Sequence, residues 1–246
     1  MLTSQRKALL LARLQQDGRL VATLLAAELS VSEDTIRRDL RELAAEGLLL
    51  RVHGGALPAS PTNLPLARRR DLQADAKGRL ARAAARLVRP GMTVLIDGGT
   101  TTLALVAALP ADIRLTVVTH GPGIAVAMEG HALVDIVLIG GRLFRHSMVA
   151  CGPEAQAGFA RVRADLCLLG VTGVHPETGL TTGDPDEAAI KRTMMAAAAD
   201  TVLMATPDKI GVSGVWGIAP LGALGTLVSV GARPDWLPPE VGHLAA

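Results

Sequence analysis

Residues 93–102 read Thr-Val-Leu-Ile-Asp-Gly-Gly-Thr-Thr-Thr. The first four residues predict a buried β-strand, because apolar and β-branched side chains follow one another without a charge. Two glycines then allow a tight turn, and three hydroxyl side chains stand where a helix to about Leu109 should begin. Free backbone N–H groups and the helix dipole favour an anion at such a helix N-terminus. The stretch therefore predicts a phosphate-binding turn. The alternative is a glycine turn that only connects the strand to the helix and binds no anion. Such a turn would not need three hydroxyl side chains.

The same alternation of strands and helices continues on both sides of this stretch. A helix is expected over residues 80–88, and another over 186–199 with Glu187 and Lys191 one turn apart. Further strands are expected at residues 115–119, 134–139, 165–169, 201–204 and 226–230, with the last of these ending the sheet. This order predicts an α/β fold, with a mostly parallel sheet covered by helices on both faces. Ligands of such sheets gather at the carboxyl ends of the strands, where the glycines, the threonines and Lys209 fall.

Residues 1–57 follow a different pattern, that of short helices. Helices are expected over residues 4–16, 23–29 and 32–46, the second of them buried through Leu24, Leu25 and Leu29. Ser32 is a good N-cap for the third helix, and Gly47 ends it. Ile36, Leu40 and Leu43 form the core face of this helix, so that its arginines point outward. A strand at residues 48–52 and a turn at 53–55 follow, as in the wing of a winged helix.

A helix that carries hydroxyls and arginines near its N-terminus has the chemistry that the DNA major groove requires, since arginine binds guanine bidentately. The alternative is that these arginines only solvate an exposed helix face. The near-absence of aromatic residues (2%, with no Tyr) argues against base stacking on single strands. Double-stranded DNA is therefore the expected partner. The candidate DNA-binding residues are Ser32, Thr35, Arg37, Arg38, Arg41, Arg51, His53 and Gly54.

A proline-rich segment separates the two patterns. Three prolines fall within residues 58–65, which excludes a helix interior there. The expected organisation is a DNA-binding domain at 1–57, a linker at 58–75 and a sensor domain at 76–246. The formal charge of +2 divides at this boundary, because residues 1–70 hold 11 Lys+Arg and 7 Asp+Glu (+4) and the remainder carries −2. The charge thus agrees with a basic DNA-reading module.

The remaining composition predicts a cytoplasmic protein without metal or cofactor. The N-terminus lacks the profile of a signal peptide. Cys151 and Cys167 do not form a C-x-x-C pair and are expected to be buried, reduced thiols. Residues 210–232 carry no charge, but their six glycines and one proline make a membrane-spanning helix improbable.

The N-terminal residues resemble the winged helix-turn-helix of the DeoR-type bacterial transcription regulators. The resemblance is carried by Arg6, by the stretch Ser32-x-x-Thr-Ile-Arg-Arg-Asp-Leu40, and by Arg51-x-His-Gly-Gly-Ala56. It implies a recognition helix at about residues 32–46, and a structural pairing of Asp39 with a nearby arginine.

The sensor domain of the same family is similar to residues 97–211. The matching pieces are Asp97-Gly-Gly-Thr-Thr-Thr102, Val117-Val-Thr119, Gly140-Gly141, Gly152-Pro153, Gly179-Leu-Thr181 with Glu187 and Lys191, and Lys209-x-Gly211. The resemblance implies a fold shared with ribose-5-phosphate isomerase and CoA-transferase relatives, and a sugar phosphate as effector. It makes residues 97–102 the phosphate loop and Lys209 the cation for the effector. The candidate effector-binding residues are Asp97, Gly98, Gly99, Thr100, Thr101, Thr102, Thr119, His120, Gly140, Gly141, Gly170, Glu187, Lys191 and Lys209.

The chain departs from the family pattern at three places around the expected pocket. His120 stands where the family usually has Asn, and it is expected either to bind the ligand or to be a structural histidine. Thr206-Pro-Asp208 replaces the usual Asp-x-Ser. Gly225 and Ser229-Val230 replace the customary aspartates.

Together these features predict a repressor of a carbohydrate operon that is relieved by a phosphorylated sugar. It should bind its operator as a symmetric dimer or tetramer, because one winged module offers few contacts. One alternative is a sugar-phosphate isomerase or CoA-transferase-like enzyme with a fused DNA-binding module, in which Asp97 or Glu187 would be the base. Another is an architectural DNA-binding protein without a ligand.

Overall fold

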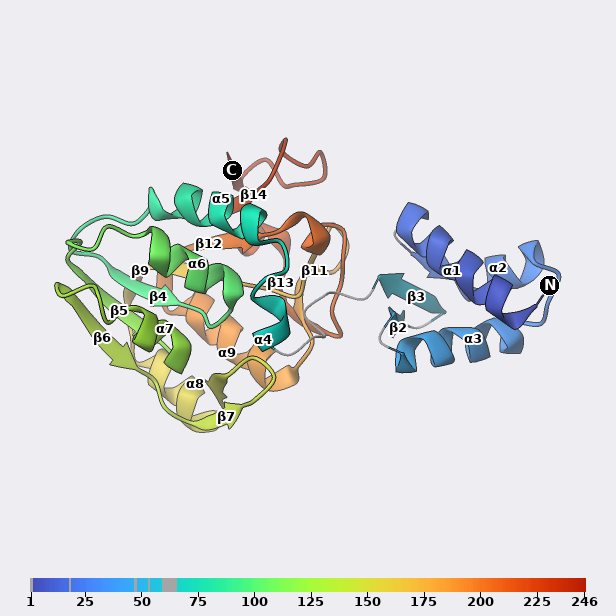
Figure 1. The fold of residues 1–246 in the computed structure, drawn as a ribbon, viewed down its shortest axis with the longest axis horizontal. Coiled ribbons are helices and arrows are strands. Elements are labelled where there is room, and N and C mark those ends of the chain that lie inside the picture. Colours follow the sequence, from blue (N-terminus) through green and yellow to red (C-terminus); the bar gives the residue numbers. More distant parts are fainter. Residues whose placement is uncertain (1, 18, 47, 53, 59–65) are drawn as a thin grey trace.

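The computed structural model describes residues 2–17, 19–46, 48–52, 54–58 and 66–246 of the chain. They form a small N-terminal lobe and a larger C-terminal lobe (Figure 1). The small lobe holds α1 (Thr3–Asp17), α2 (Ala22–Glu28) and α3 (Glu33–Ala45), with the strands β1 (Leu20–Val21), β2 (Leu49–Val52) and β3 (Gly55–Pro58). The three expected helices are thus present.

The core of the small lobe is formed by the faces that the helical spacing predicts. Leu10 and Leu14 of α1 pack with Ile36, Leu40 and Leu43 of α3, each at most 2% exposed. Leu24 was expected in this core, but that prediction is wrong, since the side chain is 68% exposed. The short helix α2 buries Ala22, Leu25 and Ala26, spaced three and four residues apart, and Leu24 therefore falls on its opposite side.

The three short strands form an antiparallel sheet in the order β1-β3-β2, and β2 with β3 makes the expected wing. Strand β1 was not expected, because two residues carry no periodic pattern. It exists through its pairing with β3, which places Gly55 against the backbone of Leu20. A Cβ at Gly55 would lie 1.7 Å from the carbonyl oxygen of Leu20, so this position requires glycine.

The large lobe contains a parallel sheet of seven strands in the order β15-β14-β12-β9-β4-β5-β6. This confirms the predicted fold class. The strands are β4 (Thr93–Ile96), β5 (Leu115–Thr119), β6 (Val134–Leu138), β9 (Ala164–Leu169), β12 (Ala198–Ala205), β14 (Thr226–Ser229) and β15 (Gly242–Ala245).

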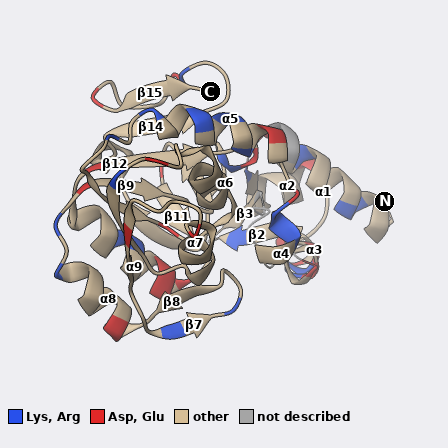
Figure 2. Cartoon of the chain, turned by 60° about the vertical axis from the view of Figure 1, so that its left-hand side comes forward, with Lys and Arg blue, Asp and Glu red and all other residues tan. Residues whose placement is uncertain are grey.

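Helices cover both faces of this sheet (Figure 1). On one face α5 (Ala74–Ala85), α6 (Thr100–Ala108) and α7 (Pro122–Ala127) pack on side chains such as Val94 and Ile96. On the other face α8 (Pro153–Ala160) and α9 (Pro185–Ala196) pack on alternate residues such as Leu95 and Cys167. Both faces of the strands are therefore buried, which explains their uninterrupted apolar runs. Basic residues recur along α5 in Figure 2, where Arg82 and Arg86 are exposed.

Two expectations about the end of the chain are wrong. Residues 226–230 do not end the sheet, because β15 pairs in parallel with β14. The helix expected to reach residue 199 ends at Ala196, since residues 198–205 pair with β9 and β14 instead. Residues 210–232 contain β13 (Trp216–Ala219), a short 3₁₀ helix and β14. Within the described ranges, no helix is long and apolar enough to span a bilayer.

Short antiparallel strands near the carboxyl ends of the parallel strands were not expected. A hairpin joins β7 (Arg142–Phe144) to β8 (Val149–Cys151), and β10 (Gly173–His175), β11 (Gly179–Thr182) and β13 (Trp216–Ala219) form a second sheet. Three single turns complete the fold: α4 (Leu66–Arg69), η2 (Pro207–Lys209) and η3 (Leu221–Ala223). Cys151 in β8 and Cys167 in β9 are free and buried, as predicted.

Candidate functional site

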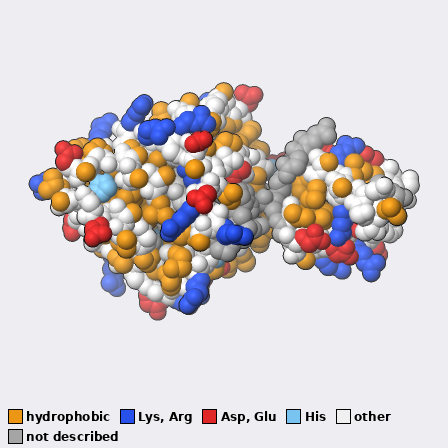
Figure 3. Space-filling model, in the orientation of Figure 1, with side chains coloured by type: hydrophobic (Ala, Val, Ile, Leu, Met, Phe, Trp, Pro, Cys, Tyr) orange, Lys and Arg blue, Asp and Glu red, His pale blue; other side chains and the backbone are white. Residues whose placement is uncertain are grey.

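The first candidate site is the outer surface of α3. Ser32 caps this helix, since its hydroxyl oxygen accepts a hydrogen bond from the backbone N–H of Thr35 (3.2 Å). Arg37 is 53% exposed and pairs with Glu33 one turn earlier (2.6 Å), whereas Arg38 and Arg41 are exposed. Figure 3 shows basic side chains on the side of the small lobe where α3 lies. This helix therefore presents arginines to an external partner.

A surface hollow beside α3 brings together several of the candidate DNA-binding residues. Thr35, Arg37, Arg38, Arg41 and Arg51 all line it, the last of these from strand β2. Gly54 lies in the turn of the wing with a φ of +79°, a left-handed conformation that favours glycine. His53 lies outside the described residues.

Asp39 points inward from α3 and is 1% exposed. It forms an ion pair with Arg6 of α1, whose guanidinium contacts both carboxylate oxygens. The expected structural pairing of Asp39 with an arginine is thereby confirmed. The pair ties α1 to α3 and holds Asp39 inside the lobe.

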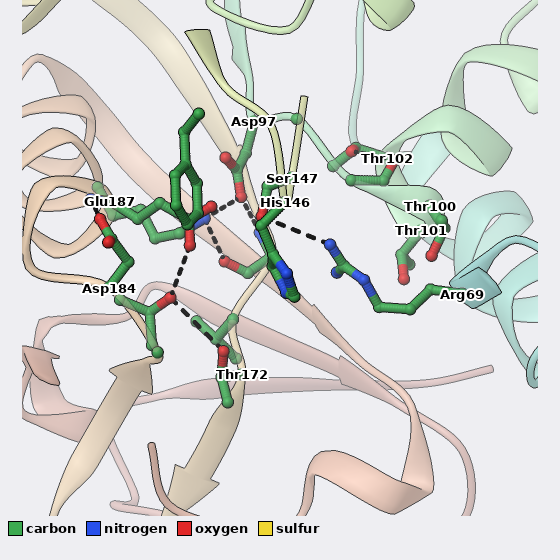
Figure 4. A pocket seen from close by; sticks show the side chains of 18 of the residues that line it. Arg69, Asp97, Thr100, Thr101, Thr102, His146, Ser147, Thr172, Asp184 and Glu187 are labelled. Carbon is green, nitrogen blue, oxygen red and sulfur yellow. Dashed lines mark hydrogen bonds and ion pairs between the residues drawn. The ribbon is translucent and has the colours of Figure 1, made fainter. Parts of the chain in front are cut away.

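The second candidate site is a cavity of about 230 Å³ at the carboxyl ends of β4 and β9 (Figure 4). Ten of the candidate effector-binding residues line it: Asp97, Gly98, Gly99, Thr100, Thr101, Thr102, Gly170, Glu187, Lys191 and Lys209. The topology explains this gathering, because residues that follow neighbouring parallel strands lie at the same edge of the sheet.

One end of the cavity is suited to an anion. Helix α6 begins at Thr100, so the backbone N–H groups of its first turn have no acceptor within the helix. Gly98 lets this turn lie against β8, since a Cβ there would be 2.1 Å from a methyl group of Val149. In Figure 4, Thr100 and Thr101 lie beside the side chain of Arg69. We call Thr100, Thr101, Arg69 and Lys209 the phosphate end of the pocket.

The two cations of the phosphate end are perturbed by burial. Arg69 donates from one terminal nitrogen to the hydroxyl of Ser147 (3.4 Å), while its Nε is buried without a hydrogen-bond partner in the described structure. Burial lowers the pKa of Arg69 below its ordinary value. Burial also lowers the pKa of Lys209 to about 8, against the opposing attraction of Asp208. A bound anion would add a negative charge beside both groups and favour their charged forms.

The other end of the cavity carries acceptors for hydroxyl groups. Asp97, Asp184, Glu187, Thr172 and Thr182 form this part, which we call the hydroxyl end (Figure 4). Thr182 donates a hydrogen bond to Glu187 (3.4 Å). Carboxylates and hydroxyls at this spacing can bind the hydroxyl groups of a sugar or polyol. Within the described residues, no group of His, Cys, Asp and Glu side chains could hold a metal ion.

Asp97 is held as a carboxylate at the base of the hydroxyl end, where it is 1% exposed. It accepts hydrogen bonds from the ammonium of Lys191 and from the backbone N–H of Gly170 (3.0 Å). Burial alone would raise the pKa of Asp97, but Lys191 and His120 outweigh this effect and bring it below its ordinary value. Burial would lower the pKa of Lys191, and the charges of Asp97 and Glu187 raise it instead. The pair is thus mutually stabilised.

Four candidate effector-binding residues do not line the cavity. The hydroxyl of Thr119 donates to the carbonyl of Ile96 (2.7 Å) and accepts from the N–H of Gly121 (3.1 Å). His120 is 1% exposed and lies behind Asp97, with Asp97 and Ala150 as its hydrogen-bond partners. Gly140 and Gly141 follow β6, which is the edge strand two positions away from β4. They lie too far along the sheet to reach the pocket.

The sequence interpretation missed several residues that line the cavity. Arg69 belonged to the expected linker, although the run Arg68-Arg-Arg70 was a visible signal. Phe144, His146 and Ser147 come from the hairpin β7–β8, for which the sequence carries no periodic signal. Asp184 had such a signal, because Asp before Pro is a common helix start, and its side chain caps α9.

Both lobes match known protein families. A family model described as the DeoR-like helix-turn-helix domain matches residues 6–62, and one described as the DeoR C terminal sensor domain matches residues 72–229. The chain is 35% identical over 214 residues to the "HTH-type transcriptional regulator GlpR" of Haloferax volcanii, with 86% of this chain and 83% of that protein covered. It is 33% identical over 209 residues to the "Glycerol-3-phosphate regulon repressor" of Escherichia coli, with 85% and 83% covered.

Two further comparisons extend these. The "Putative aga operon transcriptional repressor" of Escherichia coli O157:H7 is 31% identical over 211 residues, with 84% of this chain and 78% of that protein covered. Among solved structures, ribose 5-phosphate isomerase A from Methanocaldococcus jannaschii aligns with a TM-score of 0.41 and 14% identity, over 56% of this chain and 54% of that one. On the two family models and the full-length relatives, the chain belongs to the DeoR family of helix-turn-helix transcription regulators.

Proposed function

We propose that this regulator represses genes of carbohydrate metabolism and that a phosphorylated sugar or polyol releases it from its operator. The observation that carries the proposal is the polarity of the pocket. Its phosphate end joins a helix N-terminus to Arg69 and Lys209, and its hydroxyl end joins carboxylates to threonines. A ligand with a phosphate at one end and hydroxyls at the other matches both. The names of two relatives, repressors of a glycerol-3-phosphate regulon and of an aga operon, agree with this class.

Arg69 connects the pocket to the segment that leads to the DNA-binding lobe. It is the last residue of α4, which begins directly after the segment that joins the two lobes. The position of α4 is fixed by two contacts: Leu66 donates to the carbonyl of His146 (3.0 Å), and Lys77 donates to the carbonyl of Arg69. A phosphate that binds Arg69 changes the charge balance of this turn. If the ligand prefers one arrangement of α4, it shifts the population of linker states.

The DNA-binding lobe reads its operator as part of a homo-oligomer, a dimer or a tetramer, in the cytoplasm. We propose residues 1–57 as the DNA-reading domain, 58–75 as the linker and 76–246 as the sensor domain. Arg37, Arg38 and Arg41 of α3 enter the major groove, and Arg51 of the wing binds the phosphate backbone. Two symmetric modules on repeated half-sites supply the contacts that one module lacks.

The protein is not an enzyme in this proposal. A general base works best when its pKa lies near neutrality. Asp97 instead has a pKa below its ordinary value and is bonded to Lys191, His120 and Gly170. It is therefore a weak base for isomerisation. Turnover of ribose 5-phosphate by the purified protein, abolished by Asp97→Asn, would contradict this part of the proposal.

The test separates the two sites. Fluorescence anisotropy with operator DNA and a thermal-shift screen of sugar phosphates are measured on wild type, Arg69→Ala with Lys209→Ala, and Arg38→Ala with Arg41→Ala. A ligand at 100 times its dissociation constant should stabilise the wild type by about 2.7 kcal/mol. The pocket variant should bind DNA but ignore the ligand, and the α3 variant should do the reverse. The proposal fails if no sugar phosphate stabilises the wild type, or if the pocket variant still responds.

A further inference from the structure

His120 has a hydrogen-bond acceptor at each of its two ring nitrogens. Nδ1 lies 2.7 Å from the carbonyl oxygen of Ala150, and Nε2 lies 3.1 Å from a carboxylate oxygen of Asp97. A backbone carbonyl can only accept a hydrogen bond, so Nδ1 must carry a proton. The protonation of Nε2 then depends on the state of Asp97.

Asp97 acts as an acceptor toward all its other partners. Its second carboxylate oxygen accepts from the ammonium of Lys191 and from the N–H of Gly170 (3.0 Å). An ionised carboxylate has no proton to donate, so Nε2 of His120 must also carry one. Two N–H groups on one imidazole ring mean that the ring is a cation.

The surroundings of the ring balance this charge. The titratable groups around the cluster include Asp97 after β4, Arg69 of α4, Asp184 before α9, Glu187 and Lys191 of α9, and the thiols of Cys151 in β8 and Cys167 in β9. Burial raises the pKa of Cys151 to about 12 and that of Cys167 as well, so both thiols are neutral. The imidazolium then adds to the positive charges of Lys191 and Arg69 that face the carboxylates of Asp97 and Glu187. Phe159 of α8 closes the other side of the ring, with centroids 5.5 Å apart.

The position of His120 connects two walls of the effector pocket. Asp97 belongs to the hydroxyl end, whereas Ala150 lies in β8, just after the turn that supplies His146 and Ser147. The backbone N–H of Ala150 also donates to the carbonyl of His120 (2.8 Å). Loss of one ring proton would break either the bond to Asp97 or the bond to the hairpin. Either change alters the geometry that a ligand meets.

We propose that His120 is a positioning residue that acts as an imidazolium, and that the hydrogen bonds donated by its two ring nitrogens hold Asp97 and the β7–β8 hairpin in the arrangement that an effector meets. The inference rests on the proposed function, since it concerns the same pocket. An asparagine at this position carries both of its N–H groups on one nitrogen and does not reproduce this pair of bonds.

The protonation state is tested first, on the full chain without ligand. Nitrogen-15 labelled histidine spectra distinguish an imidazolium from either neutral tautomer. One ring should show the imidazolium pattern in the buffer used for the ligand-binding measurements. That signal should vanish in His120→Asn and persist in the control His131→Asn, which alters a histidine outside the pocket. A neutral tautomer for His120 would overturn the proposal, whatever the ligand.

The positioning role is tested second, with glycerol 3-phosphate and ribose 5-phosphate as probes. The dissociation constant should rise in His120→Asn and stay at the wild-type value in His131→Asn. A dissociation constant of His120→Asn equal to that of the wild type would overturn the positioning role. If neither probe binds the wild type, the proposed function fails and the positioning role with it, while the ring spectra still decide the protonation state.

Discussion

The surface of α3 and the pocket of the sensor lobe use cations in opposite ways. Arg38 and Arg41 are exposed on a single helix, and even the Arg37–Glu33 pair joins residues one turn apart. Lys191 is 4% exposed, and its carboxylate partner Asp97 is 94 residues away in the sequence. The first arrangement leaves the charges in contact with water, where an external partner can reach them. The second removes them from water permanently, so each charge depends on its partner for the stability of the lobe.

The largest expected effect tests this dependence on a partner. Lys191→Met leaves the carboxylate of Asp97 buried without the ammonium that forms an ion pair with it. Removal of one member of a buried pair costs about 3–5 kcal/mol. Both tryptophans of the chain, Trp216 and Trp236, lie in the sensor lobe, so their fluorescence during urea unfolding reports on this lobe alone.

The matched control for this prediction is Arg37→Ala, which breaks an exposed pair on α3. Such pairs contribute about 0.3–0.5 kcal/mol. Unfolding of the small lobe, followed by hydrogen exchange of α3 amides, should therefore change little. Equal losses of stability in the two variants would remove the distinction between buried and exposed pairs.

The second prediction concerns the contribution of the exposed arginines of α3 to operator binding. Arg38→Ala with Arg41→Ala should weaken operator binding by about 1–3 kcal/mol for each lost base contact, or lower the salt slope by about 0.9 for each lost phosphate contact. Arg82→Ala with Arg86→Ala removes the same charge from the exposed face of α5 and is the control. Anisotropy titrations at several salt concentrations measure both quantities. An equal loss in the two double variants would mean that net charge, rather than α3, governs the binding.

The contrast also explains which features could be predicted from the sequence. The cap Ser32, the core face of α3 and its outward arginines are local, because helical spacing places them within thirteen residues. The turn between β4 and α6 was equally local. Arg69, Ser147 and Thr182 were missed, because they reach the pocket through a linker turn and antiparallel pieces that lack a periodic signal. His120 was left open between ligand contact and structural role, since its partners Asp97 and Ala150 lie 23 and 30 residues away.

The third prediction uses the perturbed cation of the phosphate end. Because the pKa of Lys209 is lowered to about 8, its ammonium is charged below that pH and neutral above it. The affinity for a sugar phosphate should therefore fall as pH rises through about 8. Isothermal titration calorimetry at several pH values measures this loss. Lys209→Arg keeps a charge at all these pH values, since the guanidinium of arginine stays protonated, and should flatten the profile. An unchanged profile in that variant would exclude Lys209 from the phosphate end.

The smallest effect separates two roles of a single side chain at the start of α3. Ser32 caps the helix and is also a candidate DNA contact, so Ser32→Ala should cost about 1 kcal/mol of helix stability and weaken operator binding. Ser32→Asp keeps a capping oxygen and suits the helix dipole, but it adds a negative charge to the surface that we propose contacts the DNA phosphates. Hydrogen exchange of α3 should therefore be near that of the wild type in Ser32→Asp and faster in Ser32→Ala. Operator affinity should fall further in Ser32→Asp. If affinity instead follows helix stability across the two variants, Ser32 acts only as a cap, and the DNA contacts on α3 belong to its exposed arginines.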